Sequence, residues 1–240
     1  GEPLLFCVPL AIMAVADTGA AIVGQRRGET TFRVMDGRRS VEGSLAFFTL
    51  AFSMVLIGGA LAGKPGWPDV LLVALVVAAL TTSVEAISVR GSDNLLIPYA
   101  AWLTLERTLR LGLEELGDWV LGMGLGVGML RLTAAAAGLG PAAAVNVFLV
   151  ATLAFALGGW VWFAPLGALW ALWLLTRPRR FSTELEAVFP TTAGSVVLVL
   201  ARAHHPEVDL LAPYLATVVA HASMAAVGLA ELRSMPRIPA

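Results

Sequence analysis

The chain has 240 residues, of which 58% are hydrophobic and 14% charged, and its mean hydropathy is +0.81. A soluble domain typically has about 45–50% apolar and about 25% charged residues, so this composition excludes an ordinary soluble domain and indicates an integral membrane protein. The formal net charge of −1 does not bear on nucleic-acid binding, but the sequence has no basic face with interleaved aromatic residues, so we expect no nucleic-acid partner.

The N-terminal residues enter an apolar run at Pro3 without a preceding basic stretch. This argues against an intact signal peptide, and since the chain begins with Gly1 we expect a processed or truncated start. Cys7 is the single cysteine, so no intrachain disulfide can form, and its apolar surroundings predict a buried, inert thiol.

Nine segments are candidate membrane spans, because a helix needs about 20 apolar residues to cross a bilayer. They are residues 3–24, 44–62, 68–86, 94–111, 119–137, 142–158, 160–176, 189–203 and 210–230. The segment 94–111 carries Glu106, Arg107 and Arg110 in its last turns and is alternatively an interfacial helix. The sequence therefore predicts an all-α, polytopic membrane bundle of roughly eight to nine transmembrane segments.

Basic residues predict the orientation of this bundle, since short cytoplasmic loops accumulate Lys and Arg. Taking all nine segments as spans places the following residues on one side: Arg26, Arg27, Arg33, Arg38, Arg39, Arg90, Arg177, Arg179, Arg180, Arg233 and Arg237. We expect that side to be cytoplasmic, in the plasma membrane if the source is prokaryotic.

The first polar cluster lies inside the first span and runs from Asp17 to Gly24. An ionised Asp near the centre of a membrane helix costs about 2.5–3.5 kcal/mol on insertion scales, so a functional role is indicated. Ala20, Ala21 and Gly24 follow on the same helical face, and small residues allow a helix or a ligand to approach closely. Alternatively, a neighbouring helix or water satisfies the carboxylate.

The second cluster is the polar segment 36–44, which leads directly into the second span. Ser40 together with Glu42, or Ser44 alone, is a candidate helix cap. Arg38 and Arg39 are alternatively plain cytoplasmic charges. Read functionally, this segment offers cations and backbone donors at a helix N-terminus, an arrangement suited to phosphate.

The third cluster contains Glu85, the stretch 88–94 and Pro98. Asp93 is alternatively a plain N-cap of the following helix. Because an even number of crossings separates the second and third clusters, we expect the acids Asp17, Glu42, Glu85 and Asp93 to converge with Arg38, Arg39 and Arg90 at one membrane edge.

This combination of acids and arginines suits phosphoryl transfer from a nucleotide. Carboxylates bind Mg²⁺, arginines neutralise phosphates, and catalysis then depends on positioning and charge stabilisation. An Asp embedded in the membrane at the same edge would meet a hydroxyl delivered from the lipid.

In these motifs the chain resembles the CTP-dependent polyprenol kinases, a family that includes dolichol, phytol and farnesol kinases. The resemblance covers about the first 110 residues. It rests on Asp17-Thr18-Gly19-Ala20-Ala21 with Gly24 and Gly28, on Arg39-Ser40-Val41-Glu42-Gly43-Ser44, and on Glu85, Asp93-Asn94 and Pro98. Arg39 replaces the family's usual Lys, and Ala16 stands where Gly usually precedes the Asp.

The resemblance implies a helical membrane bundle that transfers the γ-phosphate of CTP to an isoprenoid alcohol such as phytol, geranylgeraniol or a polyprenol (dolichol). We assign catalysis to Asp17, Glu42 and Asp93, and Mg²⁺ binding to Asp17, Glu85 and Asp93. Nucleotide and phosphate binding are assigned to Arg38, Arg39, Ser40, Gly43, Ser44 and Asn94. Residues 1–117 would form this kinase-like core.

Residues 118–240 form a further transmembrane bundle whose role the sequence leaves open. Gly122, Gly124, Gly126 and Gly128 alternate in one span and predict close helix packing, not a dinucleotide site. The polar loop around His204 and His205 is expected at the opposite membrane face, as a solvated loop or, alternatively, a metal site.

Two other functions stay open. A cytidylyltransferase would join CTP to a lipid phosphate and release pyrophosphate, but the acid-rich C-terminal signature expected of phosphatidate cytidylyltransferases is absent from the sequence. A transporter would use Asp17 and His221 as relay groups inside the membrane.

Overall fold

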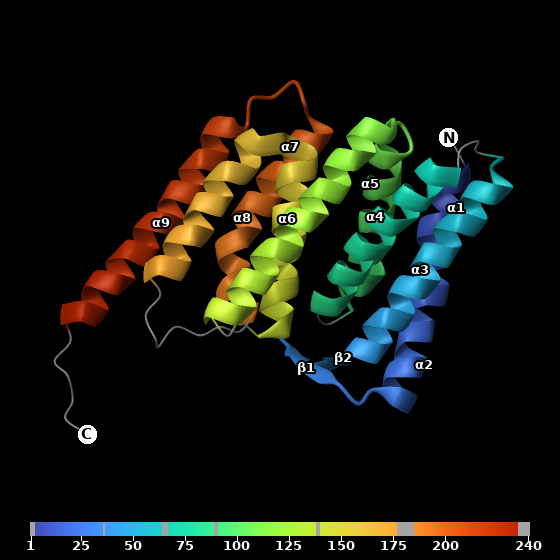
Figure 1. Cartoon of the computed structure of the whole chain (residues 1–240), viewed down its shortest axis with the longest axis horizontal. Helices are drawn as coiled ribbons and strands as arrows, with labels where there is room; N and C mark the ends of the chain where they lie inside the picture. The colour runs from blue at the N-terminus through green and yellow to red at the C-terminus, as the bar shows by residue number, and fades with distance from the viewer. Residues whose placement is uncertain are drawn as a thin grey trace.

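The structure is a computed structural model that describes residues 3–35, 37–63, 67–88, 91–137, 140–176 and 185–234. Asp36, Arg90, Arg177, Arg179, Arg180 and Arg237, which entered the predictions above, lie outside the described residues, as does the side chain of Arg233. The described part is almost entirely helical, which confirms the all-α class (Figure 1).

The first half of the chain contains one interrupted helix, a hairpin and three further helices. In chain order these are α1 (Pro3–Ala11), the π-helical turn η1 (Ile12–Asp17), α2 (Thr18–Arg27), β1 (Thr31–Val34), β2 (Gly37–Ser40), α3 (Val41–Leu61), α4 (Trp67–Ile87) and α5 (Asp93–Thr108). The hairpin lies at the end of the bundle opposite the N-terminus (Figure 1).

The second half contains α6 (Leu113–Ala137), α7 (Pro141–Thr176), α8 (Leu185–His204) and α9 (Leu211–Ser234). The helix α7 is broken at Gly159, whose φ of 66° and ψ of −162° are accessible mainly to glycine. Phe163 and Trp170 from beyond the break pack against Ala143 and Val147 from before it, so the chain doubles back there. The predicted division between the segments 142–158 and 160–176 is thereby confirmed.

Each of the nine predicted spans coincides with a helical segment. A helix alone does not show that the segment crosses a membrane. Within the described residues, four helices are long and apolar enough to cross a membrane: Pro3–Arg27, Val41–Leu61, Asp69–Ile87 and Pro141–Leu174. These helices support a membrane protein, whereas the count of eight to nine spans is not confirmed. The predicted burial of Cys7 is wrong, because its side chain lies on the exposed face of α1.

One buried cluster joins α1, η1, α2, α3, α4 and α5, together with Leu116 of α6. Ile12, Phe47, Val77 and Ile97 from η1, α3, α4 and α5 belong to it and are almost fully buried. A second cluster joins α4 to the later helices through Leu80, Trp119 and Leu149, among others. The proposed division after residue 117 falls inside α6, and both halves share packed side chains across it.

The segment 25–43, which connects the first two predicted spans, contains the β1–β2 hairpin. Its antiparallel register pairs Phe32 with Arg39 and Val34 with Gly37. Phe32 and Val34 are buried while Thr31 and Arg33 are exposed, as expected for a strand with one face against the core. The alternating residues 31–34 followed by Asp36-Gly37 are a hairpin signal in the sequence, although segment 36–44 was expected to be only a polar connection.

Candidate functional site

The hairpin determines where the two arginines of the second cluster point. Residues opposite each other in an antiparallel pair share a face, so Arg39 lies on the same face as Phe32. That face packs against Ala86 of α4 and Ala142 of α7 through Phe32 and Val34. Arg38 is on the other face, where its Nη2 donates to the Thr31 hydroxyl at 2.6 Å.

Arg39 connects the hairpin to two other elements. Its Nη1 lies 3.4 Å from Oε1 of Glu85 at the end of α4, and its Nη2 lies 3.5 Å from Oδ2 of Asp93 at the start of α5. Nη2 also donates to the carbonyl of Ser88 at 3.5 Å. The side chain of Glu85 is 5% exposed and that of Asp93 19% exposed, so one guanidinium group balances two carboxylates of different burial.

Asp17 reaches the same group of charges from the first membrane helix. It interacts electrostatically with Arg39, Asp93 and Glu85, and it is half-buried. It is the last residue of η1, and π-helical turns inside α-helices occur frequently at functional sites.

Ser44, in the first turn of α3, completes the group by donating its hydroxyl to Oε2 of Glu85 at 3.5 Å. We refer to Asp17, Arg39, Ser44, Glu85 and Asp93 together as the Arg39 cluster. It is built from η1, β2, α3, α4 and α5, all at the hairpin end of the bundle. The predicted convergence is thus observed as direct contacts for Arg39, Glu85 and Asp93, while Arg38 and Glu42 lie apart from them.

Ser40 and Gly43 have a clear structural role. The Ser40 hydroxyl accepts a hydrogen bond from the Gly43 amide at 3.1 Å, which is an N-cap of α3 and supports the capping alternative. A Cβ on Gly43 would meet the Ala20 carbonyl oxygen at 3.1 Å and the Gly24 Cα at 3.4 Å. The small residues after Asp17 thus allow α2 to lie directly against α3.

The carboxylate of Glu42 bonds to the start of the hairpin and not to the Arg39 cluster. Its Oε1 accepts the Thr30 amide at 3.0 Å, which ties the entrance of the hairpin to α3. Its other oxygen, Oε2, is buried and has no hydrogen-bond partner among the described residues. The structure does not bring Glu42 into the Arg39 cluster.

Asn94 is exposed next to the cluster, and its backbone amide forms two hydrogen-bond contacts. Its amide contacts the Gly91 carbonyl at 3.3 Å and the carboxylate of Asp93 at 3.0 Å. Ser92, not Asp93, is the N-cap residue of α5. The phosphate-binding roles assigned to Arg38, Ser40, Gly43 and Asn94 remain predictions.

The carboxylates of the cluster do not form a ready-made metal cage. Across the described ranges, no three His, Cys, Asp or Glu side chains are grouped closely enough to hold an ion. Arg39 bridges Glu85 and Asp93 instead. Mg²⁺ in nucleotide sites is commonly held by one or two carboxylates plus substrate phosphates and water, and Asp17 and Asp93 supply oxygen ligands of that kind.

The fold and the site define a helical membrane protein with a cluster of acids around one arginine at one end of the bundle. In sequence the chain is similar to a phytol kinase from Synechocystis sp. (strain ATCC 27184 / PCC 6803 / Kazusa), with 34% identity over 104 residues. Those residues are 43% of this chain and 44% of the relative, so the match spans less than half of the relative's length.

The similarity agrees with the family indicated by the motifs, and the resemblance to the polyprenol and phytol kinases is therefore confirmed. No protein-family model matches the chain. No solved structure matches it significantly.

Proposed function

We propose that the protein is a membrane lipid-alcohol kinase that transfers the γ-phosphate of CTP to an isoprenoid alcohol such as phytol, geranylgeraniol or a polyprenol. The observation that carries this proposal is the Arg39 cluster, in which Arg39 bridges Glu85 and Asp93 within electrostatic range of Asp17, a residue of a helix long and apolar enough to cross a membrane. The similarity to a phytol kinase supports the same class of reaction.

The reaction needs a group that accepts the proton of the alcohol. The hydroxyl oxygen attacks the γ-phosphorus, the bond from that phosphorus to the β,γ-bridging oxygen breaks, and CDP leaves while the proton passes to a base. Asp17 is suited to that task because it lies within the membrane span and is partly exposed. Arg39 supplies a fixed positive charge for the transferred phosphoryl group.

Mg²⁺, when bound, would neutralise charge on the triphosphate. Asp17 and Asp93 are the carboxylates suited to hold it, because both are more exposed than Glu85, whose side chain is 5% exposed. Arg39 itself would orient both Asp93 and the nucleotide phosphates.

The isoprenoid chain would lie in the bilayer beside the cluster. Only 28% of the apolar window in Pro3–Arg27 and 22% of that in Val41–Leu61 is buried inside the protein. Most residues of the helices that carry Asp17 and Ser44 are therefore not fully buried within the protein, and Val15 and Ile22 near Asp17 are among the exposed side chains. An alcohol can reach the site laterally while CTP approaches from the polar side, which we take to be cytoplasmic.

The test is CTP-dependent phosphorylation of phytol, geranylgeraniol and dolichol by the purified protein. Asp17→Asn should lower the rate by about 10²–10⁴-fold, the usual contribution of a general base. Asp93→Asn should lower it too, whereas Asp69→Asn, at the start of α4 and away from the cluster, should leave it unchanged.

Full activity in both Asp17→Asn and Asp93→Asn would refute the site. Identification of the released nucleotide separates the alternatives, because a kinase releases CDP and a cytidylyltransferase releases pyrophosphate. A transporter would catalyse neither reaction.

A further inference from the structure

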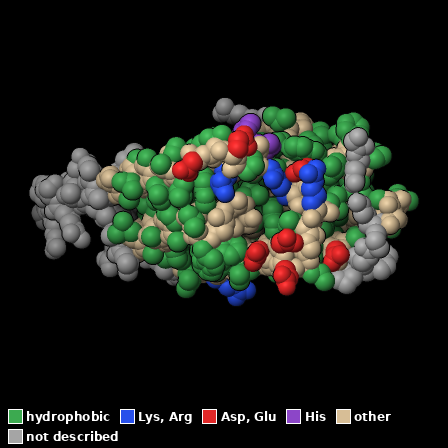
Figure 2. Space-filling model, turned by 90° about the horizontal axis from the view of Figure 1, so that it is seen from above, with side chains coloured by type: hydrophobic (Ala, Val, Ile, Leu, Met, Phe, Trp, Pro, Cys, Tyr) green, Lys and Arg blue, Asp and Glu red, His purple; other side chains and the backbone are tan. Residues whose placement is uncertain are grey.

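A second charged site lies at the opposite end of the bundle from the hairpin. It is a cavity of about 330 Å³ between the end of α5, the start of α6, the break in α7 and the end of α8. Figure 2 looks onto this end and shows basic and acidic side chains gathered on an otherwise hydrophobic surface.

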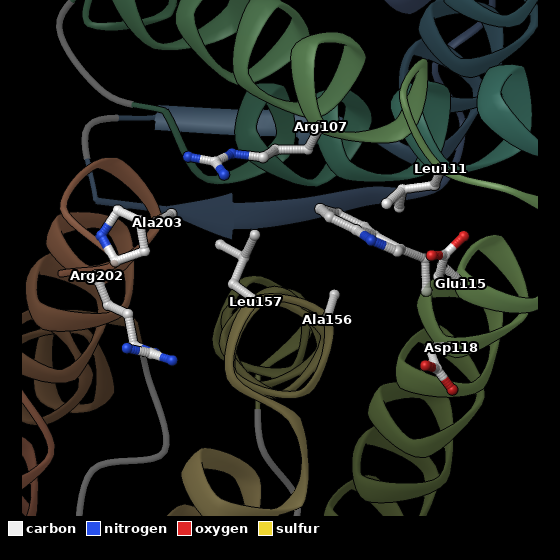
Figure 3. Close-up of a pocket in the computed structure, with 10 residues that line it drawn as sticks. Arg107, Leu111, Glu115, Asp118, Ala156, Leu157, Arg202 and Ala203 are labelled. Carbon is white, nitrogen blue, oxygen red and sulfur yellow. The ribbon is translucent and has the colours of Figure 1, made fainter.

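The walls of this cavity carry opposite charges. Figure 3 shows the guanidinium groups of Arg107 and Arg202 on one side and the carboxylates of Glu115 and Asp118 on the other. Ala156 and Leu157 lie between them and give the cavity an apolar floor.

Each of the two arginines has a partner other than Glu115 and Asp118. Arg107 Nε pairs with Glu106 Oε2 at 3.3 Å, and Arg202 lies over the Trp162 ring at 5.8 Å. Glu115 is fixed by accepting the Gly112 amide at 2.6 Å. Within the described part of the chain, no ion pair joins either arginine to Glu115 or Asp118, so the opposite charges face each other across open space.

The residues beside the cavity are of the kind found at a boundary between lipid and water. Tyr99, Trp102 and His204 form a ring stack with centroid separations of 6.1–6.2 Å, and His204 follows Ala203, which lines the cavity. Aromatic side chains with a polar edge concentrate at the headgroup level of membranes.

We propose that this cavity binds the headgroup of an ethanolamine phospholipid from the membrane leaflet opposite the Arg39 cluster. Arg107 and Arg202 bind the phosphate, Glu115 and Asp118 bind the ammonium group, and the apolar floor receives the glycerol and the start of the acyl chains. A purely anionic ligand would leave Glu115 and Asp118 without a counter-charge, whereas a zwitterion matches the charges of both walls.

The test is native mass spectrometry of the purified full chain, titrated with lipids of identical acyl chains. Phosphatidylethanolamine should be retained about tenfold more strongly than phosphatidylglycerol, which carries the phosphate without an amine. Water-soluble phosphoethanolamine should compete only weakly, because it lacks the apolar part.

A substitution in the acidic wall should change which lipid is preferred, and one in the basic wall should weaken the binding of both lipids. Asp118→Asn should abolish the preference for phosphatidylethanolamine over phosphatidylglycerol, whereas Arg202→Gln should weaken retention of both lipids by about tenfold. Arg131→Gln, an exposed arginine of α6 that does not line the cavity, should change neither.

Equal retention of the two lipids by the unsubstituted chain would overturn the proposal, as would an unchanged preference in Asp118→Asn. Binding of soluble phosphoethanolamine as strong as that of the lipid would indicate a soluble ligand and would also overturn it. Because Asp118→Asn is nearly isosteric and exposed, its outcome can be read even if Arg202→Gln fails to fold.

Discussion

At the scale of single residues, the site depends on the shape of one guanidinium group. Arg39 uses Nη1 for Glu85 and Nη2 for Asp93 and the Ser88 carbonyl. The planar fork of arginine can hold such partners at fixed positions, whereas the ammonium group of lysine is a point charge. The family that the motifs resemble usually has Lys here, so Arg39 gives this chain a more rigid link between hairpin and helices.

Removing this arginine should destabilise the protein. Arg39→Ala leaves the carboxylate of Glu85, which is 5% exposed, without its counter-charge, and we expect the free energy of unfolding to fall by about 1–3 kcal/mol. Adding Glu85→Gln should restore part of that loss, because a neutral amide needs no counter-charge. The free energies of unfolding of the two single variants and the double variant form a double-mutant cycle. They are measured by unfolding the purified proteins in detergent, monitored by circular dichroism.

The matched control is the neighbouring Arg38→Ala. Arg38 lies on the outer face of the hairpin and bonds only the exposed Thr31 hydroxyl among the described residues, so its loss should change stability by less than about 0.5 kcal/mol. Equal destabilisation by the two substitutions would contradict the role given to Arg39.

At the scale of elements, glycines decide how closely the helices pack. In α6, a Cβ on Gly126 would lie 2.8 Å from the Thr152 hydroxyl and 2.9 Å from the Phe148 carbonyl oxygen of α7. A Cβ on Gly122 would also contact α7, whereas Gly124 and Gly128 face open space. The predicted close packing is thus confirmed for two of the four alternating glycines, which are spaced four residues apart as in small-residue membrane interfaces.

This difference predicts opposite effects for the same substitution at two nearby positions. Gly126→Ala should destabilise the protein by about 1–3 kcal/mol, because the backbone carbonyl of Phe148 cannot move aside easily. Gly124→Ala should be neutral or stabilise by up to about 1 kcal/mol, since alanine favours the helix. Thermal unfolding in detergent compares them, and a larger loss in Gly124→Ala would show that α6 faces α7 differently.

The hairpin is the other element on which the site depends. Its inner face rests on Ala86 of α4 and on Ala142 and Val145 of α7, so a helix of the second half supports the strand that carries Arg39. Residues 118–240 therefore contribute to positioning the Arg39 cluster, whatever further role they have.

At the scale of the whole molecule, the two charged sites occupy opposite ends of the bundle. The hairpin and the start of α5 lie at one end, and the loop after α8 lies at the other (Figure 1). If the bundle spans the membrane, these ends face opposite compartments.

Cysteine labelling tests this arrangement. In a Cys7→Ser background, Gly37→Cys and Ser92→Cys should react with a membrane-impermeant maleimide from the same side, and His205→Cys from the other side. Vesicles of known orientation provide the measurement. Labelling of positions 37 and 92 from opposite sides would rule out a single nucleotide site formed by the Arg39 cluster.

The sequence by itself determined the helical class and the approximate helix positions, because apolar composition and segment length depend on local residues alone. It also identified Asp17, Arg39, Glu85 and Asp93, since charged groups near membrane helices are costly and stand out. The turn at Gly159 was visible for a similar reason, as paired glycines interrupt an otherwise continuous apolar run.

Only the tertiary structure decided which of these residues meet. The alternation of a four-residue strand directed Arg39 inward and Arg38 outward, and the contact of Gly24 with Gly43 brought α2 against α3. Glu42 was left bonded to the Thr30 amide, outside the cluster. Side-chain direction and helix contact depend on partners distant in sequence, so neither residue type nor spacing could supply them.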